Sequence, residues 1–437
     1  MKTNWIRMTA MAASLAVLLG IPGARAVTAT AAEPQGQPKY TRAEYDAYQA
    51  AAAEKNLQQK IKLLDDFVAK YPTSALMAFV YNEYVTDYYQ LQQWSKDIEY
   101  LDKFLALSDI NDGARLAAEY QRSALFEAAY SPKAPDAKEQ AGKAREAAAV
   151  GLKVLEAFKK PEQMSDQDWA GKKSQYAVQF YNTAGVASLH LKDYKSAVDY
   201  FSKSVGENEV QPAIYYSMGK ADLQEDPPQY MDGFWAIARA LDQKLPEADK
   251  VAPFLQERVH NYQLPLCDSL VDSQIKELLA LAKNSKTRPA GYTIPSAADL
   301  AKIREKDPPA LLASLRGGGD TAKTTWLAVC NGEFPETFFG KVYEVNAASP
   351  DAIVVKAAIG STEEELKDIT APNCDLKIAG QPDAARLEKE GIIRFAGKLT
   401  GYTPDPFSLT WENVKVNPED IPEEKGKKPT KKPAKKP

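Results

Sequence analysis

Two glycines at equivalent places in neighbouring helical segments constrain the fold of this chain more than any other feature. Gly185 lies in the segment FYNTAGVASLHLKDYKSAVDYFSKSV (180–205), and Gly219 lies in AIYYSMGKADLQED (213–226). The two glycines are 34 residues apart. A fixed period of this length in adjacent segments indicates stacked copies of one helix-turn-helix unit, because small residues recur where the two helices of each unit touch.

The residues around Gly185 resemble the tetratricopeptide repeat. Small and aromatic side chains stand at the spacing of that family: Tyr181, Ala184, Tyr194, Ala197, Phe201 and Ser204. The resemblance implies a solenoid of helix pairs that bury a continuous core and leave a concave face lined by the first helix of each pair. We expect about five or six such pairs over residues 41–285.

Other copies precede and follow these two. The segments that align with the repeat or have helical spacing of apolar residues are 57–72, 78–90, 94–107, 113–158 and 247–283. Val85 stands where the repeat prefers glycine, so this earlier copy is divergent. The second helix near residues 230–240 is degenerate, because Pro227 and Pro228 occupy its usual entry. The last pair is expected to cap the stack.

The positions that face the groove in this family map onto seven residues of the chain. They are Phe79, Asn82, Tyr89, Asn182, Val186, Tyr216 and Lys220. An aromatic and amide lining suits an extended peptide, so the resemblance implies a protein or peptide ligand. A packing role stays open, because tyrosines at helical spacing also fill the space between repeats. The Lys/Asn clamp that some members use for C-terminal carboxylates is absent, since Asn182 and Val186 stand at two of its key positions.

The stretch RGGGDTAKTT (316–325) partly matches the phosphate-binding loop G-x-x-x-x-G-K-[ST]. Counted from Gly317, the lysine and threonine fall correctly, but Ala322 stands where the second glycine must approach phosphate. The preceding DPPALLASLR (307–316) predicts a short helix, whereas a phosphate loop leaves a buried strand. We therefore expect a glycine turn between helices, with Gly317 capping the first, and no nucleotide cofactor.

From Phe334 onward the pattern changes to short strands. Five β runs are predicted: 338–346, 352–360, 374–379, 391–403 and 407–417. One short helix, DAARLEKE (383–390), precedes the fourth run. This order, with G-x-V at Gly340 and F-x-G-x-L at Phe395, resembles a bacterial OB-fold barrel.

The expected barrel lacks the usual features of a nucleic-acid site. OB folds bind single-stranded nucleic acid or sugars through their second and third strands, often with aromatic platforms. Those strands carry no aromatic residue here. Residues 331–424 contain nine basic and 18 acidic residues, and this excess of acids disfavours a phosphate backbone. We expect a passive or protein-binding barrel.

The N-terminus predicts export. Two basic residues precede an apolar run (8–21), and a small-x-small site follows at Ala-Arg-Ala (24–26). These are the parts of a secretory signal over residues 1–26, although a second such site at 29–31 leaves the cleavage residue open. The run is shorter than the roughly 20 residues that span a bilayer, and no transmembrane segment is expected elsewhere. We expect a bacterial protein that is periplasmic or secreted.

Charge separates the body of the chain from its C-terminal tail. Of 55 basic residues, three lie in the signal and seven in residues 425–437, so 45 remain to face all 59 acidic residues. The body therefore carries about −14 and repels polyanions. The tail sequence KGKKPTKKPAKKP predicts a disordered segment. Its expected partners are anionic envelope polymers or membrane surface, with a simple solubility segment as the alternative.

Few residues in the chain suit catalysis or metal binding. Three cysteines permit one intramolecular disulfide, and we expect Cys330 with Cys374 because both border or lie in the C-terminal module; buried free thiols are the alternative. The only two histidines, His190 and His260, are expected to be structural or on the surface. The paired acids at Glu363–Glu365 are expected in a solvated loop. No catalytic, cofactor-binding or metal-binding residue is predicted.

The predicted protein is multidomain and mainly α. Its parts are a signal (1–26), a linker (27–40), a tetratricopeptide-like solenoid (41–285), a linker with short helices (286–330), an OB-like β domain (331–422) and a disordered Lys/Pro tail (423–437). The expected function is that of a non-enzymatic exported scaffold, which binds a protein or peptide partner in cell-envelope organisation or assembly. The alternative is a saccharide- or nucleic-acid-binding protein that acts through the barrel and the tail.

Overall fold

The computed structural model describes residues 39–349 and 352–423. The predicted signal (1–26) and the lysine pairs of the tail (425–436) lie outside these residues, so both stay predictions. Among the described residues, no helix combines the length and the apolar character that crossing a membrane requires.

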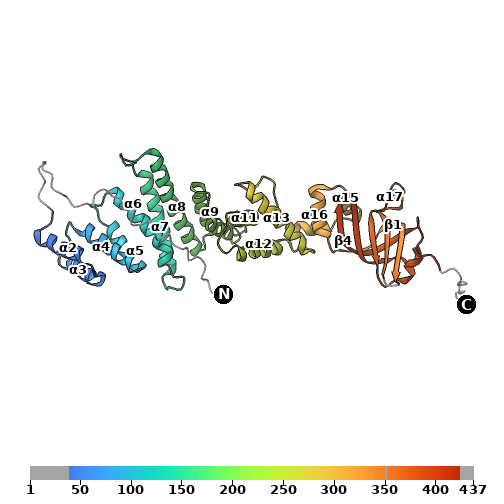
Figure 1. The fold of residues 1–437 in the computed structure, drawn as a ribbon, viewed down its shortest axis with the longest axis horizontal. Helices are drawn as coiled ribbons and strands as arrows, with labels where there is room; N and C mark the ends of the chain where they lie inside the picture. Colours follow the sequence, from blue (N-terminus) through green and yellow to red (C-terminus); the bar gives the residue numbers. More distant parts are fainter. Residues whose placement is uncertain (1–38, 350–351, 424–437) are drawn as a thin grey trace, which may run out of the picture. The chain divides into compact units, whose positions relative to one another are not determined.

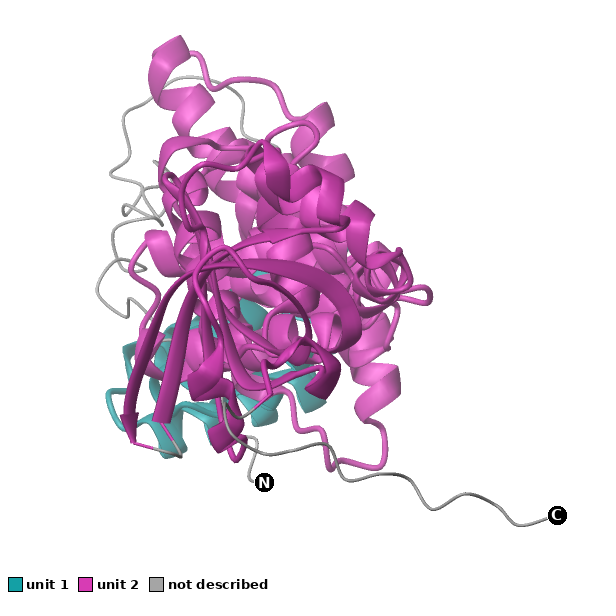
Figure 2. Cartoon of the chain, turned by 90° about the vertical axis from the view of Figure 1, so that its right-hand side faces the viewer, with its two compact units in different colours: residues 1–107 teal, residues 108–437 magenta. Residues whose placement is uncertain are grey.

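The chain divides into two compact units, residues 1–107 and residues 108–437 (Figure 2), and each is described by itself. The first unit contains two helix pairs (Figure 1): α2 (Arg42–Ala53), α3 (Leu57–Lys70), α4 (Met77–Gln90) and α5 (Trp94–Leu105). Side chains satisfy the backbone at two of the helix starts, because Thr41 forms a capping box and Asn56 accepts from the third residue beyond it.

The second unit begins with four further helix pairs. They are α6 (Asp112–Ala129), α7 (Ala137–Ala157), α8 (Asp166–His190), α9 (Tyr194–Glu207), α10 (Pro212–Asp222), α11 (Tyr230–Asp242), α12 (Ala248–Gln263) and α13 (Asp268–Asn284). Six pairs are therefore present among the described residues, within the predicted number. The helical region is a tetratricopeptide-like repeat fold, as the 34-residue period predicts.

The same turn ends three helices of the repeats. Gln92 after α4, Lys192 after α8 and Lys244 after α11 adopt left-handed φ angles of 55°, 60° and 60°. In each case the N–H of the following residue donates to the carbonyl five positions earlier, at 2.9, 2.9 and 3.1 Å. This bond satisfies a carbonyl that the end of the helix leaves without an intrahelical partner. The turn then directs the chain back along the helix it has left.

Gly185 marks the closest approach between α8 and α9. A Cβ atom at this position would lie 2.4 Å from Cε1 of Phe201, whose side chain is fully buried. Gly219 has the same role between α10 and α11, where a Cβ would lie 2.7 Å from the carbonyl oxygen of Gly233. The period read from the sequence therefore marks two equivalent helix crossings, because only glycine leaves room for the facing helix.

The helix that looked degenerate in the sequence has a long unbroken run of buried residues. Every residue of α11 from Gly233 to Ala240 is buried. This helix packs against α10, α12 and α13, so it needs no polar face. Pro227 and Pro228 precede it and lie in the turn before Tyr230.

The glycine-rich stretch 316–325 forms a turn between two helices, as predicted. Helix α15 (Pro308–Arg316) ends at Gly317, and α16 (Gly319–Val329) follows at once. Gly318 has a φ of 68°, which favours glycine because a side chain would be strained there. Ala322 is buried on α16, so its side chain contributes to packing. A third helix, α14 (Ala297–Arg304), precedes this pair.

Five strands close into a barrel, and they match the five predicted runs. They are β1 (Glu333–Ser349), β2 (Ala352–Gly360), β3 (Cys374–Ile378), β4 (Ile392–Pro404) and β5 (Phe407–Val416). The order around the barrel is β1-β2-β3-β5-β4, and β1 also pairs with β4 to close it. The β3–β5 pair is parallel and the other pairs are antiparallel. The predicted helix at 383–390 is a short 3₁₀ helix, η1 (Pro382–Arg386), before β4.

Helices α14 to α16 share one hydrophobic core with the barrel. Leu300 and Leu315 of these helices are buried in the same cluster as Trp411, the largest fully buried side chain. The Tyr402 hydroxyl of β4 also donates to the Leu315 carbonyl at 3.0 Å. These helices therefore pack as part of the barrel, although the sequence places them in a linker (286–330). The predicted domain boundaries themselves stay predictions.

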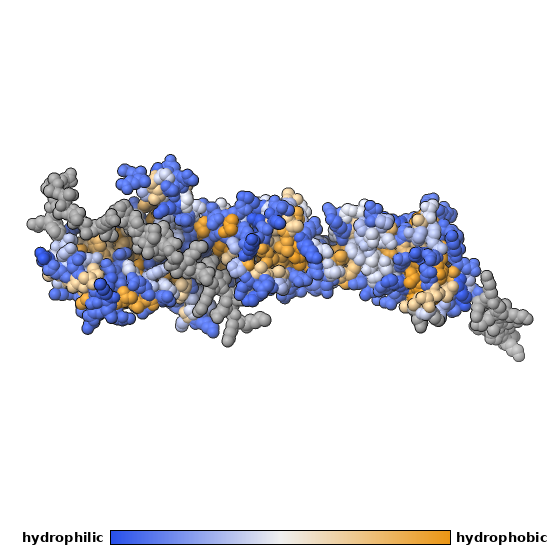
Figure 3. Space-filling model, viewed as in Figure 1, coloured by the Kyte–Doolittle hydropathy of each residue, from blue (hydrophilic) through white to orange (hydrophobic). Residues whose placement is uncertain are grey.

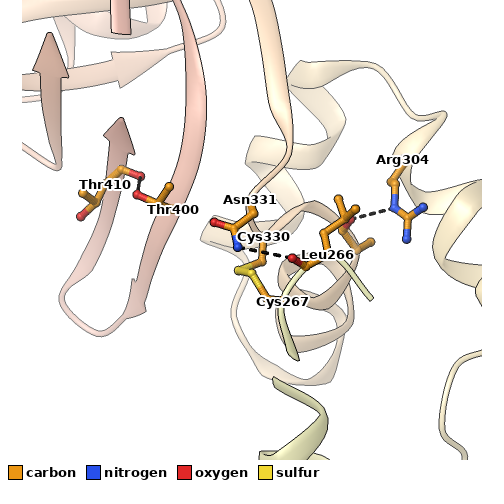
Figure 4. The surroundings of a disulfide bond; sticks show 8 residues. Leu266, Cys267, Arg304, Cys330, Asn331, Thr400 and Thr410 are labelled. Atoms are coloured by element: carbon orange, nitrogen blue, oxygen red, sulfur yellow. Dashed lines mark hydrogen bonds between the residues drawn. A yellow bond between two sulfur atoms is a disulfide. The ribbon is translucent and has the colours of Figure 1, made fainter. Parts of the chain in front are cut away.

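The disulfide joins Cys267 to Cys330, with the Cα atoms 5.9 Å apart, so the expected pairing of Cys330 with Cys374 is wrong. Cys374 lies on β3, where it is buried in the barrel core and its thiol donates to the Ala357 carbonyl at 3.2 Å. Burial raises the pKa of the Cys374 thiol. Figure 4 shows the bond at the end of α16, beside Asn331, whose amide donates to the Leu266 carbonyl at 3.3 Å. The bond therefore ties the last helix pair to the entry of the barrel.

Candidate functional site

The predicted groove residues belong to two sets, one in each compact unit. On α4, Phe79 is 58% exposed, and its ring centroid lies 6.1 Å from that of Tyr48 on α2. Asn82 is exposed one turn further along. Tyr89 is half-buried and meets Trp94 edge-on, with 5.5 Å between ring centroids. Phe79 and Asn82 are therefore accessible in this unit, whereas Tyr89 packs against the next helix; their ligand contacts stay predictions.

The first unit also buries an ionic cluster, which we define as Lys60, Glu83 and Asp87. The ammonium of Lys60 on α3 binds Glu83 and Asp87 of α4, the latter at 3.1 Å. Burial raises the pKa of Asp87, and the Lys60 ammonium opposes this rise. Burial and the nearby Glu83 carboxylate raise the pKa of Tyr48 to about 12. Because Lys60 of α3 binds both acids of α4, this cluster holds the two helices together.

Asn182 of α8 is engaged within the repeats of the second unit. Its side-chain oxygen accepts from the Ser204 hydroxyl at 2.6 Å, and its amide donates to the Gln211 side chain at 3.1 Å. Val186, one turn further, packs against the cluster that contains Phe201. These contacts join α8 to α9 and to the start of α10. Both residues contribute to packing here, and their predicted role in ligand binding stays untested.

Tyr216 and Lys220 of α10 lie in a larger group that includes two residues of α12. Lys220 Nζ lies 5.2 Å from the centroid of the Tyr216 ring. Tyr216 meets Phe254 edge-on, with 6.2 Å between centroids, and Arg258 Cζ lies 5.0 Å from the centroid of Phe254. We call these four residues the aromatic–cation cluster. Both contacts between a cation and a ring are within the range of cation–π attraction.

The cluster has an aromatic floor and cationic edges. Tyr216 is buried, Phe254 and Lys220 are half-buried, and Arg258 is exposed. Burial lowers the pKa of Lys220. Burial raises the pKa of Tyr216, while the nearby Arg258 charge opposes this rise. The site therefore holds positive charge beside apolar rings in a partly desolvated setting, where an anion interacts more strongly than in bulk water.

No ion pair joins Lys220 or Arg258 to a carboxylate within residues 39–349 and 352–423. Two lysines that lie over tyrosines on second helices, Lys103 of α5 and Lys203 of α9, differ in this respect. Lys103 lies 4.1 Å from the Tyr100 centroid and binds Glu99 at 2.9 Å. The equivalent residues of α9 do the same: Lys203 lies 5.8 Å from the Tyr200 centroid and binds Asp199 at 2.8 Å.

Sequence reasoning found only half of the aromatic–cation cluster. It identified Tyr216 and Lys220 but not Phe254 and Arg258. The signal was present, since an aromatic residue is followed four positions later by a cation in α10 and again 38 residues later in α12. This interval exceeds the 34-residue period, so alignment to the repeat does not detect it. Spacing of three or four residues places such side chains on one helix face.

The acidic run at Glu363–Glu365 lies on a short helix, α17 (Glu363–Lys367), and not in the expected loop. The Thr362 side chain caps the helix start. Glu365 accepts from Arg316 at 2.7 Å and from the Ser361 N–H at 2.6 Å. Although burial opposes it, these partners hold the pKa of Glu365 below its ordinary value. The acid therefore anchors α15 to the barrel, because Arg316 also donates to the Ile359 carbonyl.

The two histidines take part in separate local contacts. The His190 ring lies 4.0 Å from the Tyr130 ring, and His260 is 2.9 Å from the Asp268 carboxylate. In the part of the chain that the structure describes, no group of three or more His, Cys, Asp or Glu residues is arranged to hold a metal ion.

Comparisons with known proteins leave the fold assignment to the structure itself. No family model and no curated protein matches the chain. Among solved structures, the chain is similar to the TPR2AB domain of yeast Sti1 in a complex with pHSP90, with 16% sequence identity. The match covers 55% of this chain and 85% of that chain, with a TM-score of 0.17. The superposition is therefore poor, and the repeat fold rests on the helix pairs, turns and glycine crossings described above.

Proposed function

We propose that this protein is a non-enzymatic exported scaffold, which binds a protein or peptide partner through the first helices of its repeats. The observation that carries the proposal is the aromatic–cation cluster on α10 and α12. Consecutive first helices present aromatic rings and cations that have no acidic partner among the described residues. Stacked helix pairs present such first-helix faces to extended ligands.

Two observations support export and a role in the bacterial cell envelope. The first is the secretory signal read from residues 1–26. The second is the disulfide between Cys267 and Cys330, because disulfides persist in oxidising compartments and are rare in the cytosol. A periplasmic or secreted location follows from this proposal, and the lysine-rich tail (425–437) is proposed to contact anionic envelope surfaces.

The barrel is proposed to be an OB-like domain with a secondary, protein-contacting or passive role. Its strand order and the short helix between β3 and β4 support the OB-like assignment. The excess of acids in residues 331–424 supports a partner other than nucleic acid. Arg394 illustrates how the basic residues of the barrel are used, since it binds Asp420 at 2.9 Å and Glu419 at 3.3 Å.

Partner capture from a bacterial envelope extract tests the scaffold role. The mature protein is immobilised as wild type, as Lys220→Met/Arg258→Met and as Lys203→Met, and bound proteins are quantified by mass spectrometry. We expect a partner that wild type and Lys203→Met retain and that the double variant loses. Retention of the same proteins by all three forms, or by none, contradicts binding through the first helices.

A further inference from the structure

We infer that the aromatic–cation cluster takes an extended acidic peptide segment, with carboxylates on alternate residues and apolar atoms against the rings. This inference rests on the proposed scaffold function and names the chemistry of its ligand. The site consists of Tyr216, Lys220, Phe254 and Arg258. None of them belongs to the ionic cluster of the first unit or to the barrel.

The charge of the site selects an anion. Lys103, Lys203 and Lys220 each lie over a tyrosine ring, but they differ in whether a carboxylate also binds the lysine. Those two lysines bind Glu99 and Asp199 of their own helices, so their charge is already neutralised. Lys220 and Arg258 lack such a carboxylate among the described residues, although the body of the chain has an excess of acids. A ligand carboxylate is the group that fits, because charge-assisted hydrogen bonds to Lys and Arg are strong.

The spacing of the site selects an extended segment. The Tyr216 and Phe254 ring centroids are 6.2 Å apart on neighbouring helices. Side chains two positions apart on an extended chain lie on the same side and are separated by roughly 6.6 Å. Two acidic side chains at i and i+2 therefore match the step between the two rings. The methylene groups of each can lie over one ring, and its carboxylate can then reach the cation beside that ring.

The site fits a peptide better than a nucleic acid. Single strands are held by basic grooves that follow many phosphates, and their affinity depends on the number of phosphates neutralised. This cluster provides two cations within a body of about −14, which repels a polyanion. An acidic peptide presents its charge only where the cluster accepts it, so it avoids most of that repulsion.

Fluorescence polarisation with synthetic peptides on the full mature protein tests the inference. The probe is a labelled dodecamer that contains one Glu-Leu-Glu segment flanked by Gly and Ser, with an amidated C-terminus. Comparators are its Glu-to-Gln counterpart, the same acidic peptide with a free C-terminal carboxylate, and a labelled oligo-dT. We expect the amidated acidic peptide to bind, to weaken at high salt, and to lose about tenfold or more in affinity in Lys220→Met/Arg258→Met.

Lys203→Met is the matched control, since Lys203 also lies over a tyrosine but already binds Asp199. It should leave peptide affinity unchanged. Equal affinity for the Glu and Gln peptides, or unchanged affinity in the double variant, overturns the inference; binding through the lysine-rich tail would give the second result. Preference for oligo-dT overturns it in favour of nucleic acid. If only the peptide with a free C-terminal carboxylate binds, the site recognises a chain end, and the inference of an internal acidic segment is overturned.

A footprint on the unmodified protein keeps the inference testable even if the double variant does not fold. Acetylation of lysines is followed by mass spectrometry with and without the amidated acidic peptide. We expect the peptide to slow acetylation of Lys220 and to leave Lys203 unchanged; equal protection of both overturns the site. If the acidic peptide binds but no partner is captured, the envelope scaffold role is contradicted and the acidic-peptide chemistry of the site is supported. If a partner is captured equally well by wild type and by Lys220→Met/Arg258→Met, the scaffold role is supported and the acidic-peptide site is contradicted.

Discussion

The α4–α5 pair of the first unit and the α8–α9 pair of the second have the same turn but different interiors. Both end their first helix on a left-handed residue, Gln92 or Lys192, with matching backbone hydrogen bonds. Inside α8–α9, Gly185 lets Phe201 pack directly against the helix backbone. Inside α4–α5, Val85 is buried where the glycine would stand.

The pair without glycine fills its interior with stacked tyrosines. Tyr84 and Tyr100 stack with 4.0 Å between ring centroids, and Tyr88 stacks on Tyr100 at 5.4 Å. The Tyr84 hydroxyl donates to Asp65 of α3 at 2.6 Å, which satisfies its polar end. The comparison indicates that the turn defines the repeat locally, while the helix crossing accommodates different side chains as long as the interior is filled.

The surface also differs from place to place in what it presents. Figure 3 shows hydrophilic residues over most of the visible face, with apolar residues in a few separate patches. Large exposed apolar side chains occur in both units, for example Phe79 in the first and Leu264 in the second. Scattered exposure of this kind is normal, so charge arrangement discriminates binding surfaces better than hydropathy does in this chain.

Two buried acids, one in each unit, have opposite surroundings. Asp87 of the first unit is fully buried and is bound by Lys60. Asp222 of the second unit is 4% exposed, and no ion pair to it is found among the described residues. Burial, and the charges of Asp232 and Glu225, raise the pKa of Asp222 to about 7. Each difference between the units leads to an experiment.

Replacing Lys60 should have the largest effect. Lys60→Met leaves the fully buried Asp87 and the half-buried Glu83 without their cation, and we expect a loss of roughly 3–5 kcal/mol in the stability of the first unit. Hydrogen exchange followed by mass spectrometry measures this loss in α3 and α4. Lys60→Met/Asp87→Leu should recover part of it, because the uncompensated buried charge is removed. Unchanged exchange in the single variant would contradict a structural role for the ionic cluster.

Asp222→Asn should stabilise the second unit at alkaline pH. The folded-state pKa near 7 exceeds the ordinary value of 3.8, so the folded state binds the proton more tightly, and stability falls as pH rises between these values. We expect Asp222→Asn to be more stable than wild type by about 2–4 kcal/mol at pH 8 and similar to it near pH 4. Thermal unfolding from pH 4 to 8 measures the difference. Asp226→Asn, at an exposed position, is the control. If the stability of wild type and of Asp222→Asn changes with pH in the same way, the raised pKa of Asp222 is contradicted.

Gly185→Val should destabilise the second unit by roughly 1–3 kcal/mol, because the added carbons overlap the Phe201 ring. Gly171→Ala on the same helix meets no atom within 4 Å. It should raise stability by up to about 1 kcal/mol through helix propensity alone. Chemical denaturation of both variants checks the pair of values. Similar effects of the two substitutions would mean that α8 and α9 do not approach at Gly185.

Phe79→Ala should have the smallest effect on stability, within about 0.5 kcal/mol, because the side chain is more than half exposed. Phe67→Ala of the same unit is the contrast, since Phe67 is 2% exposed and its loss should cost about 3–5 kcal/mol. Thermal unfolding distinguishes the two. A large loss for Phe79→Ala would show that this residue belongs to the packing of the first unit and not to an accessible face.

Local sequence signals predict the elements of this protein well. The period between Gly185 and Gly219 predicts helix crossings, and the alternating runs after Phe334 predict all five strands, because helix faces and strand pleats follow from short-range spacing. The turn at Gly317 is predicted for the same reason, because a glycine directly after a helical run is a local signal for the end of a helix.

Local sequence signals did not predict the aromatic–cation cluster as a whole or the pairing of the disulfide. Phe254 meets Tyr216, and Cys267 meets Cys330, only once distant segments have packed, and their separations follow no repeat period. Whether a charge is neutralised is likewise a property of the folded chain. Lys203 and Lys220 look alike in sequence, each a few residues after a tyrosine, but only the former has an acid on its own helix face. Spacing along the chain determines the elements, whereas partners are determined by the distances that packing brings about.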